Sequence, residues 1–276
     1  MTGSPVWING SLRSGADATL RYDDHGITVG DGAFETIRQV NGVPFALSRH
    51  LNRLDASLCT LRLPTVERQM ILDAIGQVLD ASPGSNGFLR VTVTGGPGPL
   101  GSPRDQLDPT VIVALRPGEM RIDPTDVVTV PWPRNERGAL AGVKSTSYAE
   151  NVVALVVAAD HGASEALFPN TRDELCEGTG SNVVVVLDGR LVTPPLDSGC
   201  LAGVTRALLL AAMPEIVEAA VPMAAVARVD EMFLVSTTRE VQPVARLDGR
   251  TMRTDGQLTA QARQRWLVAY PHCADW

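Results

Sequence analysis

Lys144 is the only lysine among the 276 residues. The other basic side chains are 23 arginines, once Lys144 is taken from the total of 24 lysines and arginines. Either residue type can carry a solvated charge. Only a lysine amine can lose its proton and condense with a carbonyl group, because a guanidinium stays protonated to above about pH 12. By composition alone, Lys144 could be an ordinary surface lysine that has not been replaced by arginine. The residues around it favour a nucleophile.

The segment Ala141–Tyr148 surrounds this lysine. Gly142 and Val143 predict a strand that ends at Lys144, and Ser145–Ser147 predict the N-terminal cap of a helix that follows. An amine at the end of a strand can be partly desolvated, which favours its neutral form. A lysine that forms a Schiff base needs this property.

Two other segments have the composition of a cofactor site. Glu177 precedes a turn of Gly, Thr and Ser, which is typical either of a surface turn or of a carboxylate that pairs with a cationic ring nitrogen. The segment 200–206 opens a helix with Thr205, whose hydroxyl and neighbouring N–H groups suit a phosphate, and Ser236–Thr238 end an apolar strand. A lysine, a carboxylate and a phosphate cradle in this order indicate pyridoxal phosphate.

The sequence lacks the motifs that other cofactors and reactions require. The chain has no dinucleotide-binding GxGxxG, no phosphate-binding GxxxxGK[ST] and no nucleophile elbow GxSxG. Its four histidines and four cysteines show no metal-ligand spacing, so we expect no metal site. A net charge of −7 argues against nucleic-acid binding, and no apolar run approaches the ~18 residues of a membrane span. We expect a cytoplasmic protein whose cysteines are buried or semi-buried free thiols: Cys59, Cys176, Cys200 and Cys273.

The N-terminal part predicts hairpins followed by helices. Asn41-Gly42 marks a hairpin bend between strands at 34–40 and 43–47. We expect two amphipathic helices, one at 49–62 capped by Ser48 and one at 66–79 capped by Thr65. The remaining elements of this part are strands at 6–10, 88–94 and 110–115, and an irregular Gly/Pro-rich loop at 95–103.

The C-terminal part is richer in strands. The stretch 117–124 contains three breakers and is the best candidate for a linker. The pattern therefore predicts a domain at 1–116 and a second at 125–276. Strands are expected in the second domain at 127–130, 165–168, 182–187 and 232–236, with helices at 147–161, 203–212 and 257–268.

Seven motifs in order resemble the fold-type IV, or class IV, pyridoxal-phosphate enzymes. This family includes D-amino-acid and branched-chain aminotransferases, (R)-amine transaminases and 4-amino-4-deoxychorismate lyase. The resemblance covers the chain from about Gly30 to Val244. It implies an α+β or α/β fold with a small N-terminal α/β domain and a larger C-terminal pseudo-barrel domain. The motifs are Gly30–Thr36, His50–Leu54, Gly142–Lys144, Glu165–Phe168, Glu177–Asn182, Leu201–Arg206 and Ser236–Pro243.

The resemblance also implies roles for individual residues. Lys144 is the catalytic residue and forms the Schiff base, and Glu177 pairs with the ring nitrogen. Leu201 packs on the ring, and Tyr148 reaches the phenolic oxygen, although it lies one residue closer to the lysine than in the branched-chain enzymes. A homodimer with its active site at the subunit interface is implied as well. The other residues expected to bind the cofactor or its phosphate are Arg53, Ser181, Asn182, Gly203, Val204, Thr205 and Thr237.

The features that select the reaction are mixed. Thr237 and Thr238 resemble the D-amino-acid aminotransferases, and 34–38 resembles aminotransferases generally. The Arg-x-His carboxylate clamp of the D-amino-acid enzymes is missing, however, and the Gly-rich stretch 95–102 stands closer to the lyases. The expected substrate-binding residues are Phe34, Arg38, Arg90 and Thr238; for the two arginines a structural ion pair is an equal alternative.

We expect a transaminase that acts on a D-amino acid or (R)-amine with a 2-oxo acid as acceptor. The alternative is 4-amino-4-deoxychorismate lyase, which eliminates pyruvate to give 4-aminobenzoate. A non-catalytic carrier of pyridoxal phosphate is a third hypothesis. The presence of both Lys144 and Glu177 argues against a carrier, because carriage needs no electron sink.

Overall fold

The computed structural model describes residues 4–271, and the chain divides into two compact units. Unit 1 contains residues 4–119 and 143–148, and unit 2 contains residues 120–142 and 149–271. The first crossing between units falls inside the expected linker 117–124. Residues 143–148 group with unit 1, although the sequence had placed them in the C-terminal domain. Lys144 therefore belongs to the first unit.

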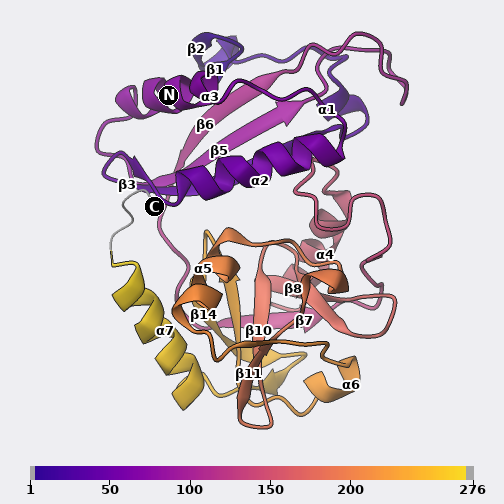
Figure 1. Cartoon of the computed structure of the whole chain (residues 1–276), viewed down its shortest axis with the longest axis vertical. Helices are drawn as coiled ribbons and strands as arrows, with labels where there is room; N and C mark the ends of the chain where they lie inside the picture. The colour runs from indigo at the N-terminus through magenta and orange to yellow at the C-terminus, as the bar shows by residue number, and fades with distance from the viewer. Residues whose placement is uncertain (1–3, 272–276) are drawn as a thin grey trace. The chain divides into compact units, whose positions relative to one another are not determined.

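A six-stranded sheet forms the centre of unit 1 (Figure 1). Every neighbouring pair in it is antiparallel, with the strand order β2-β1-β6-β5-β3-β4. The Asn41-Gly42 hairpin is confirmed as the connection between β3 and β4. The strands are β1 (Pro5–Ile8), β2 (Ser11–Ser14), β3 (Gly32–Val40), β4 (Val43–Pro44), β5 (Gly87–Thr94) and β6 (Val111–Pro117).

Two amphipathic helices, α2 (Leu47–Thr60) and α3 (Arg68–Asp80), cover one face of this sheet. Along β3, side chains alternate between the helix-covered face and the other face, because successive Cβ atoms in a strand point to opposite sides. Ala33 and Ile37 enter the core with the leucines of α2, each of which contributes roughly 1.5–3 kcal/mol on full burial. Unit 1 also contains a 3-10 turn (Gly15–Asp17) and α1 (His25–Thr28).

Both expected helix caps in unit 1 are wrong. Helix α2 begins at Leu47, one residue before Ser48, and its N-cap is Ala46 in the left-handed conformation. Phe45 N donates to Arg38 O at 2.7 Å, so the hairpin fixes the chain up to the first helical turn. Helix α3 is capped by Glu67 and not by Thr65. Tertiary contacts override a local capping preference of about 1 kcal/mol.

Unit 2 is built on a nine-stranded mixed sheet with the order β12-β11-β10-β13-β14-β7-β8-β9, and β15 pairs with β14. The pairs β11–β12, β14–β7 and β7–β8 are parallel. Strand β9, at one end of the order, contacts β10, so the sheet curls as expected for the pseudo-barrel. The strands are β7 (Thr125–Thr129), β8 (Glu165–Pro169), β9 (Leu175–Gly178), β10 (Asn182–Leu187), β11 (Arg190–Thr193), β12 (Val217–Glu218), β13 (Met232–Ser236), β14 (Glu240–Leu247) and β15 (Arg250–Thr251).

The helices of unit 2 pack against individual strands. Helix α4 (Ala149–Asp160) contacts β8, while α5 (Val204–Ala212) contacts β13 and α7 (Gln257–Ala269) contacts β14. A short α6 (Met223–Val226) and a 3-10 turn (Leu196–Ser198) complete the unit. The predicted strands at 182–187 and 232–236 are confirmed to the residue. Strands β9, β11 and β14 were not predicted.

Candidate active site

The segment that carries Lys144 is bound to the end of β3. Phe34 N donates to Lys144 O at 3.0 Å, and Thr146 N donates to Gly32 O at 2.8 Å. The hydroxyls of Thr146 and Ser147 donate to Gly30 O at 2.8 and 2.9 Å. The expected strand ending at the lysine is therefore wrong: the segment forms one isolated bridge to β3, and these hydroxyls hold it there.

Glycine makes this close approach possible. A Cβ on Gly32 would lie 2.7 Å from Val93 O and 3.0 Å from Thr146 Oγ1. Gly30 has a φ of +68°, and a Cβ there would lie 2.8 Å from Ser147 Oγ. Only glycine adopts this backbone without strain, so the residues before β3 decide where the lysine sits.

Two aromatic side chains lie near the amine of Lys144 within unit 1, and a guanidinium lies near one of them. The Nζ atom lies 4.3 Å from the ring centroid of Phe34 and 5.9 Å from that of Tyr148, and the two rings meet edge to face at 5.3 Å. The Arg90 guanidinium lies 3.4 Å from the centroid of the same Phe34 ring. An amine and a guanidinium thus share one aromatic ring on the face of the sheet opposite the helices.

On the helix-covered face, β3 carries a buried carboxylate. Glu35 accepts hydrogen bonds from Arg53 Nε at 2.8 Å, Arg53 Nη2 at 2.7 Å and His50 Nδ1 at 2.7 Å. Burial alone raises the pKa of Glu35, but these hydrogen bonds outweigh it and lower the pKa to about 2. Burial also lowers the pKa of His50, more than the Glu35 carboxylate raises it, so neutral His50 donates its Nδ1–H. Both carboxylate oxygens of Glu35 therefore accept hydrogen bonds from Arg53 or His50.

In unit 2, β9 presents a second carboxylate. Glu177 is half-buried, and its Oε2 accepts from Leu201 N at 2.8 Å. Its Oε1 lies 3.5 Å from Arg134 Nε. The two oxygens of Glu177 thus have different surroundings, a backbone donor at one and an arginine at a longer distance at the other.

The loop before α5 is tied to β10 by Asn182. Asn182 Nδ2 donates to Leu201 O at 2.8 Å, and a Cβ on Gly203 would lie 2.0 Å from Asn182 Oδ1. Gly203 caps α5 without a side-chain hydrogen bond, and Thr205 is buried in the first turn. The first N–H groups of a helix have no acceptor within the helix, so the start of α5 presents donors to an anion.

A third carboxylate, Glu165 on β8, ties two turns together. Its Oε1 accepts from Thr179 N at 3.0 Å and from the Thr179 hydroxyl, and its Oε2 accepts from Ser181 Oγ at 2.9 Å. Arg239 Nε lies 3.5 Å from the same Oε2, and Arg239 ends the turn that contains Thr237. Glu165 thus positions both the turn after Glu177 and the turn after β13.

The family model described as "Amino-transferase class IV" matches residues 32–247, which covers most of both units. The chain belongs to the class IV aminotransferases. These enzymes depend on pyridoxal phosphate. The start of α5 suits the phosphate of this cofactor, because the N-cap glycine leaves the first N–H groups uncovered.

Similar proteins are known from several organisms. A putative branched-chain-amino-acid aminotransferase from Methanocaldococcus jannaschii is 32% identical and covers 95% of this chain and 94% of its own. A D-alanine aminotransferase from Staphylococcus haemolyticus is 26% identical, with 94% of each chain covered.

Solved structures of this family superpose on more than nine tenths of the chain. The fold IV transaminase CpuTA1 from Curtobacterium pusillum has a TM-score of 0.81 at 31% identity, with 93% of each chain covered. A PLP-bound hypothetical aminotransferase from Mycobacterium tuberculosis has a TM-score of 0.85 at 26% identity, covering 96% of this chain and 98% of its own. A putative 4-amino-4-deoxychorismate lyase from Legionella pneumophila has a TM-score of 0.85 at 24% identity, covering 91% and 95%, and shows the shared fold alone.

The predicted site residues of this aminotransferase fall into two groups, one in each unit. Unit 1 brings Phe34 and Tyr148 to Lys144, and it places Arg90 over the Phe34 ring. Arg38 lies half-buried on β3 at a position that shares the Phe34 face. Arg53, predicted to bind phosphate, engages Glu35 through Nε and Nη2, and its phosphate role stays a prediction.

In unit 2 the structure brings Glu177, Leu201, Asn182 and Gly203 into contact. The hydroxyl of Ser181 donates to Glu165, so its contact with a cofactor also stays a prediction. The remaining predicted residues lie at the start of α5 and in the turn after β13: Val204, Thr205, Thr237 and Thr238.

Sequence reasoning missed the partners of these residues. The strand pattern could have revealed Glu35, because it places a carboxylate on the core face between Ala33 and Ile37 and so demands a buried cation. His50 and Arg53, three residues apart on α2, supply the donors. Nothing in the sequence pattern indicated that Arg134 would approach Glu177.

Other expected features concern the whole chain. Within residues 4–271, no group of three His, Cys, Asp or Glu side chains could hold a metal ion, and no helix is long and apolar enough to cross a membrane. Cys176 and Cys200 are buried free thiols, and burial raises the pKa of Cys200 to about 11. Cys59 is exposed, contrary to the prediction, and Cys273 lies outside the described residues.

Proposed function

We propose that this aminotransferase transfers an amino group between a D-amino acid or (R)-amine and a 2-oxo acid. The observation that supports it most is the group formed by Lys144, Phe34 and Arg90 in unit 1. The lysine supplies an amine that can form a Schiff base, and the guanidinium supplies a partner for a carboxylate. A transaminase needs both for its amino-acid and 2-oxo-acid substrates.

Pyridoxal phosphate, when bound, supplies an aldehyde for the Schiff base and a ring that accepts the electrons of the substrate Cα. We assign Lys144 to the covalent link and to the proton that moves to and from the substrate. Glu177 accepts the ring N–H, Leu201 packs on the ring, and Tyr148 donates to the phenolic oxygen. The groups assigned to the cofactor phosphate or to the adjoining backbone are Arg53, Ser181, Asn182, Gly203, Val204, Thr205 and Thr237.

We assign substrate recognition to Phe34, Arg38, Arg90 and Thr238. Arg90 is exposed and stacks on Phe34, so its guanidinium edge can meet a carboxylate in a bidentate pair. The D-alanine aminotransferases among the relatives support a D-amino acid as donor, whereas the relative from Methanocaldococcus jannaschii supports a branched-chain amino acid. The donor is therefore what the experiment must decide.

The second candidate, 4-amino-4-deoxychorismate lyase, is favoured by the loop that follows β5. This loop is irregular and glycine-rich and lacks an Arg-x-His clamp. His25 Nε2 hydrogen-bonds Pro99 O at 2.8 Å, and Arg104 Nε donates to Asp31 Oδ2 at 2.7 Å, so the loop is fixed at two points. The missing clamp is the stronger of the two observations, because it argues against the carboxylate recognition of the D-amino-acid enzymes. The fixed loop is compatible with a bulky ring substrate but is less specific evidence for it.

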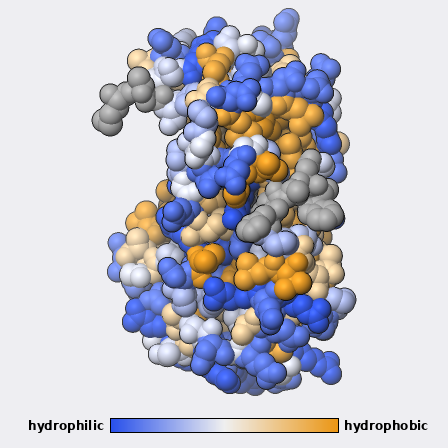
Figure 2. Space-filling model, turned by 90° about the vertical axis from the view of Figure 1, so that its left-hand side faces the viewer, coloured by the Kyte–Doolittle hydropathy of each residue, from blue (hydrophilic) through white to orange (hydrophobic). Residues whose placement is uncertain are grey.

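We propose a homodimer in the cytoplasm, with the active site completed at the subunit interface. Helix α4 buries Ala154 and Ala158 and exposes Val152, Val153 and Val156, each by more than half of its surface. Apolar residues also gather in patches within the otherwise hydrophilic face drawn in Figure 2. Exposed apolar patches of this kind are typical of protein–protein interfaces.

A single-turnover experiment tests the proposed reaction. The purified holoenzyme is mixed with D-alanine, (R)-1-phenylethylamine or L-leucine, and the absorbance of the cofactor is followed. Conversion to the pyridoxamine form with release of a 2-oxo acid or ketone from either of the first two supports the proposal. Conversion by L-leucine alone would assign a branched-chain enzyme. Pyruvate released only from aminodeoxychorismate would assign the lyase.

A further inference from the structure

The side chain of Arg134 is fixed in front of Glu177 by three neighbours of unit 2. Its guanidinium lies 4.1 Å from the ring centroid of Phe168. Its Nη1 donates to Glu150 Oε2 at 2.9 Å and to Asn151 Oδ1 at 3.2 Å. Within the described part of the chain, the buried Nε makes no hydrogen bond, and it lies 3.5 Å from Glu177 Oε1.

Asn151 links this guanidinium to the turn that follows Glu177. It is a buried amide on α4, three residues before Ala154, which is buried in the core with Ala166 and Phe168 of β8. Its Oδ1 accepts from Arg134, and its Nδ2 donates to Thr179 O at 2.5 Å. One buried side chain therefore sets the distance between the guanidinium and the turn 178–181. Because a buried amide must satisfy both its ends, it resists movement of either partner.

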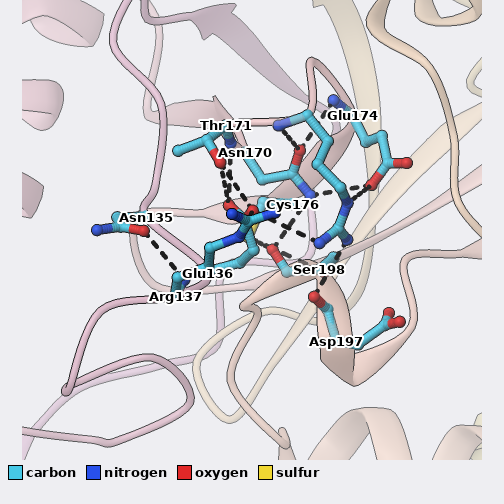
Figure 3. Close-up of polar contacts among 10 residues, drawn as sticks. Asn135, Glu136, Arg137, Asn170, Thr171, Glu174, Cys176, Asp197 and Ser198 are labelled. Carbon is cyan, nitrogen blue, oxygen red and sulfur yellow. Dashed lines mark hydrogen bonds and ion pairs between the residues drawn. The ribbon is translucent and has the colours of Figure 1, made fainter.

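The segments next to Arg134 and Glu177 are anchored as well, and Figure 3 draws the polar contacts of Glu136 and Cys176 in these segments. Glu136, two residues after Arg134, accepts from Thr171 N at 3.0 Å and from Thr171 Oγ1 at 2.7 Å. Cys176, the residue before Glu177, contacts Ser198 O through its sulfur at 3.2 Å. Ser198 lies three residues before Leu201, whose N–H binds the carboxylate. The three segments that meet at Glu177 are thus held to one another.

We infer that Arg134 is a positioning residue that keeps the Glu177 carboxylate ionised and in one orientation for the ring N–H of the cofactor. The inference rests on the proposed role of Glu177. A cation within about 4–6 Å favours the charged form of a carboxylate. Leu201 N donates to Oε2 and Arg134 faces Oε1, so the orientation of the Glu177 carboxylate is set before a ligand binds.

The direct test is a titration of the Glu177 carboxyl group in the full-length chain without cofactor. Carbon-13 labelling of glutamate followed by NMR gives the titration, and Glu177→Gln identifies the signal. We expect Arg134→Met to raise the pKa of Glu177 by about one unit or more, because the opposite charge is removed. An unchanged titration overturns the inference.

Glu150→Gln is the matched control. Glu150 contacts the same guanidinium from an exposed position, so its replacement leaves Arg134 in place through Phe168 and Asn151. We expect no resolved change in the titration of Glu177. A shift as large as that of Arg134→Met would contradict the inference, because general loosening of the region would then explain both.

Arg134→Lys serves where the Met variant does not fold. It keeps the positive charge but loses the planar guanidinium that packs on Phe168. We expect Glu177 to titrate close to the wild type, while the dissociation constant of pyridoxal phosphate rises about tenfold, which corresponds to 1.36 kcal/mol. A tenfold rise in Glu150→Gln as well, or in neither variant, would overturn the inference.

The test separates this inference from the proposed function. If Arg134→Met shifts the titration while Glu177→Gln leaves the turnover of the holoenzyme unchanged, the coupling stands and the assigned role of Glu177 is wrong. If the titration does not move, the inference fails whatever Glu177→Gln does.

Discussion

Two carboxylates, one in each unit, differ in burial and in how closely they pair with an arginine. Glu35 is buried in unit 1 and accepts three hydrogen bonds from Arg53 and His50 at 2.7–2.8 Å. Glu177 is half-buried in unit 2 and has one backbone donor at 2.8 Å and one cation at 3.5 Å. Both lie on strands, and both face an arginine. Only the first accepts hydrogen bonds from its arginine, whereas the second lies 3.5 Å from its arginine.

The difference agrees with a structural role for Glu35 and with the ligand role that we propose for Glu177. A buried charge is tolerated only when it is paired and hydrogen-bonded, so Glu35 stabilises the fold by satisfying Arg53 and His50. A carboxylate that serves a ligand needs an orientation and a charge but must keep lone pairs open. Replacing each carboxylate by its neutral amide therefore affects different properties.

The largest effect is expected for Glu35→Gln. The substitution removes the charge that Arg53 requires in a buried position, and breaking such a pair costs about 3–5 kcal/mol. We expect the free energy of unfolding to fall by this amount, measured by urea denaturation with circular dichroism. Equal stability of Glu35→Gln and wild type would mean that Glu35 is not the structural member of the comparison.

The same carboxylate predicts a loss of stability in acid. The pKa of Glu35 is about 2 in the fold, against an ordinary value of 4.5, so its contribution is complete above about pH 5 and is lost as the pH falls towards 2. The full loss is about 3 kcal/mol. His50, whose pKa is also lowered in the fold, acts in the same direction below its ordinary value of 6.5. Urea midpoints at pH 7, 4 and 3 should show a steeper decline in the wild type than in Glu35→Gln.

A smaller effect on stability but a clear one on turnover is expected for Glu177→Gln. The half-buried amide still accepts from Leu201 N, so unfolding should change by no more than about 1 kcal/mol. Turnover should fall about tenfold or more, a barrier increase of at least about 1.4 kcal/mol, because the ring nitrogen no longer faces a negative charge. Stopped-flow absorbance and urea denaturation measure the two quantities on one preparation. A variant that loses stability but keeps turnover would reverse the comparison.

The sequence predicted the elements whose signals are local. The Asn41-Gly42 hairpin, the leucine stripe of α2 and the strands 182–187 and 232–236 follow from turn chemistry and periodicity. Strand β14 begins with Glu240 and contains Pro243, which weaken any local strand signal, and pairing with β13 and β7 forms it.

The sequence could not predict contacts between residues far apart in the chain. The local pattern predicts that the Lys144 segment is the end of a strand. In the structure its backbone hydrogen bonds are with β3, more than a hundred residues earlier in the chain. For the same reason the approach of Arg134 to Glu177 was missed. Residue types identified the candidate site, whereas long-range pairing decided how each side chain is held.

The central claim is that the amine of Lys144 holds the cofactor through a covalent bond. Borohydride reduces a Schiff base to a stable amine, and peptide mapping by mass spectrometry locates the resulting pyridoxyl group. We predict a single label on the peptide that contains Lys144, and none in the matched variant Lys144→Arg, which keeps the charge but cannot form the bond. A label on another residue, or a labelled Lys144→Arg chain, would contradict the account.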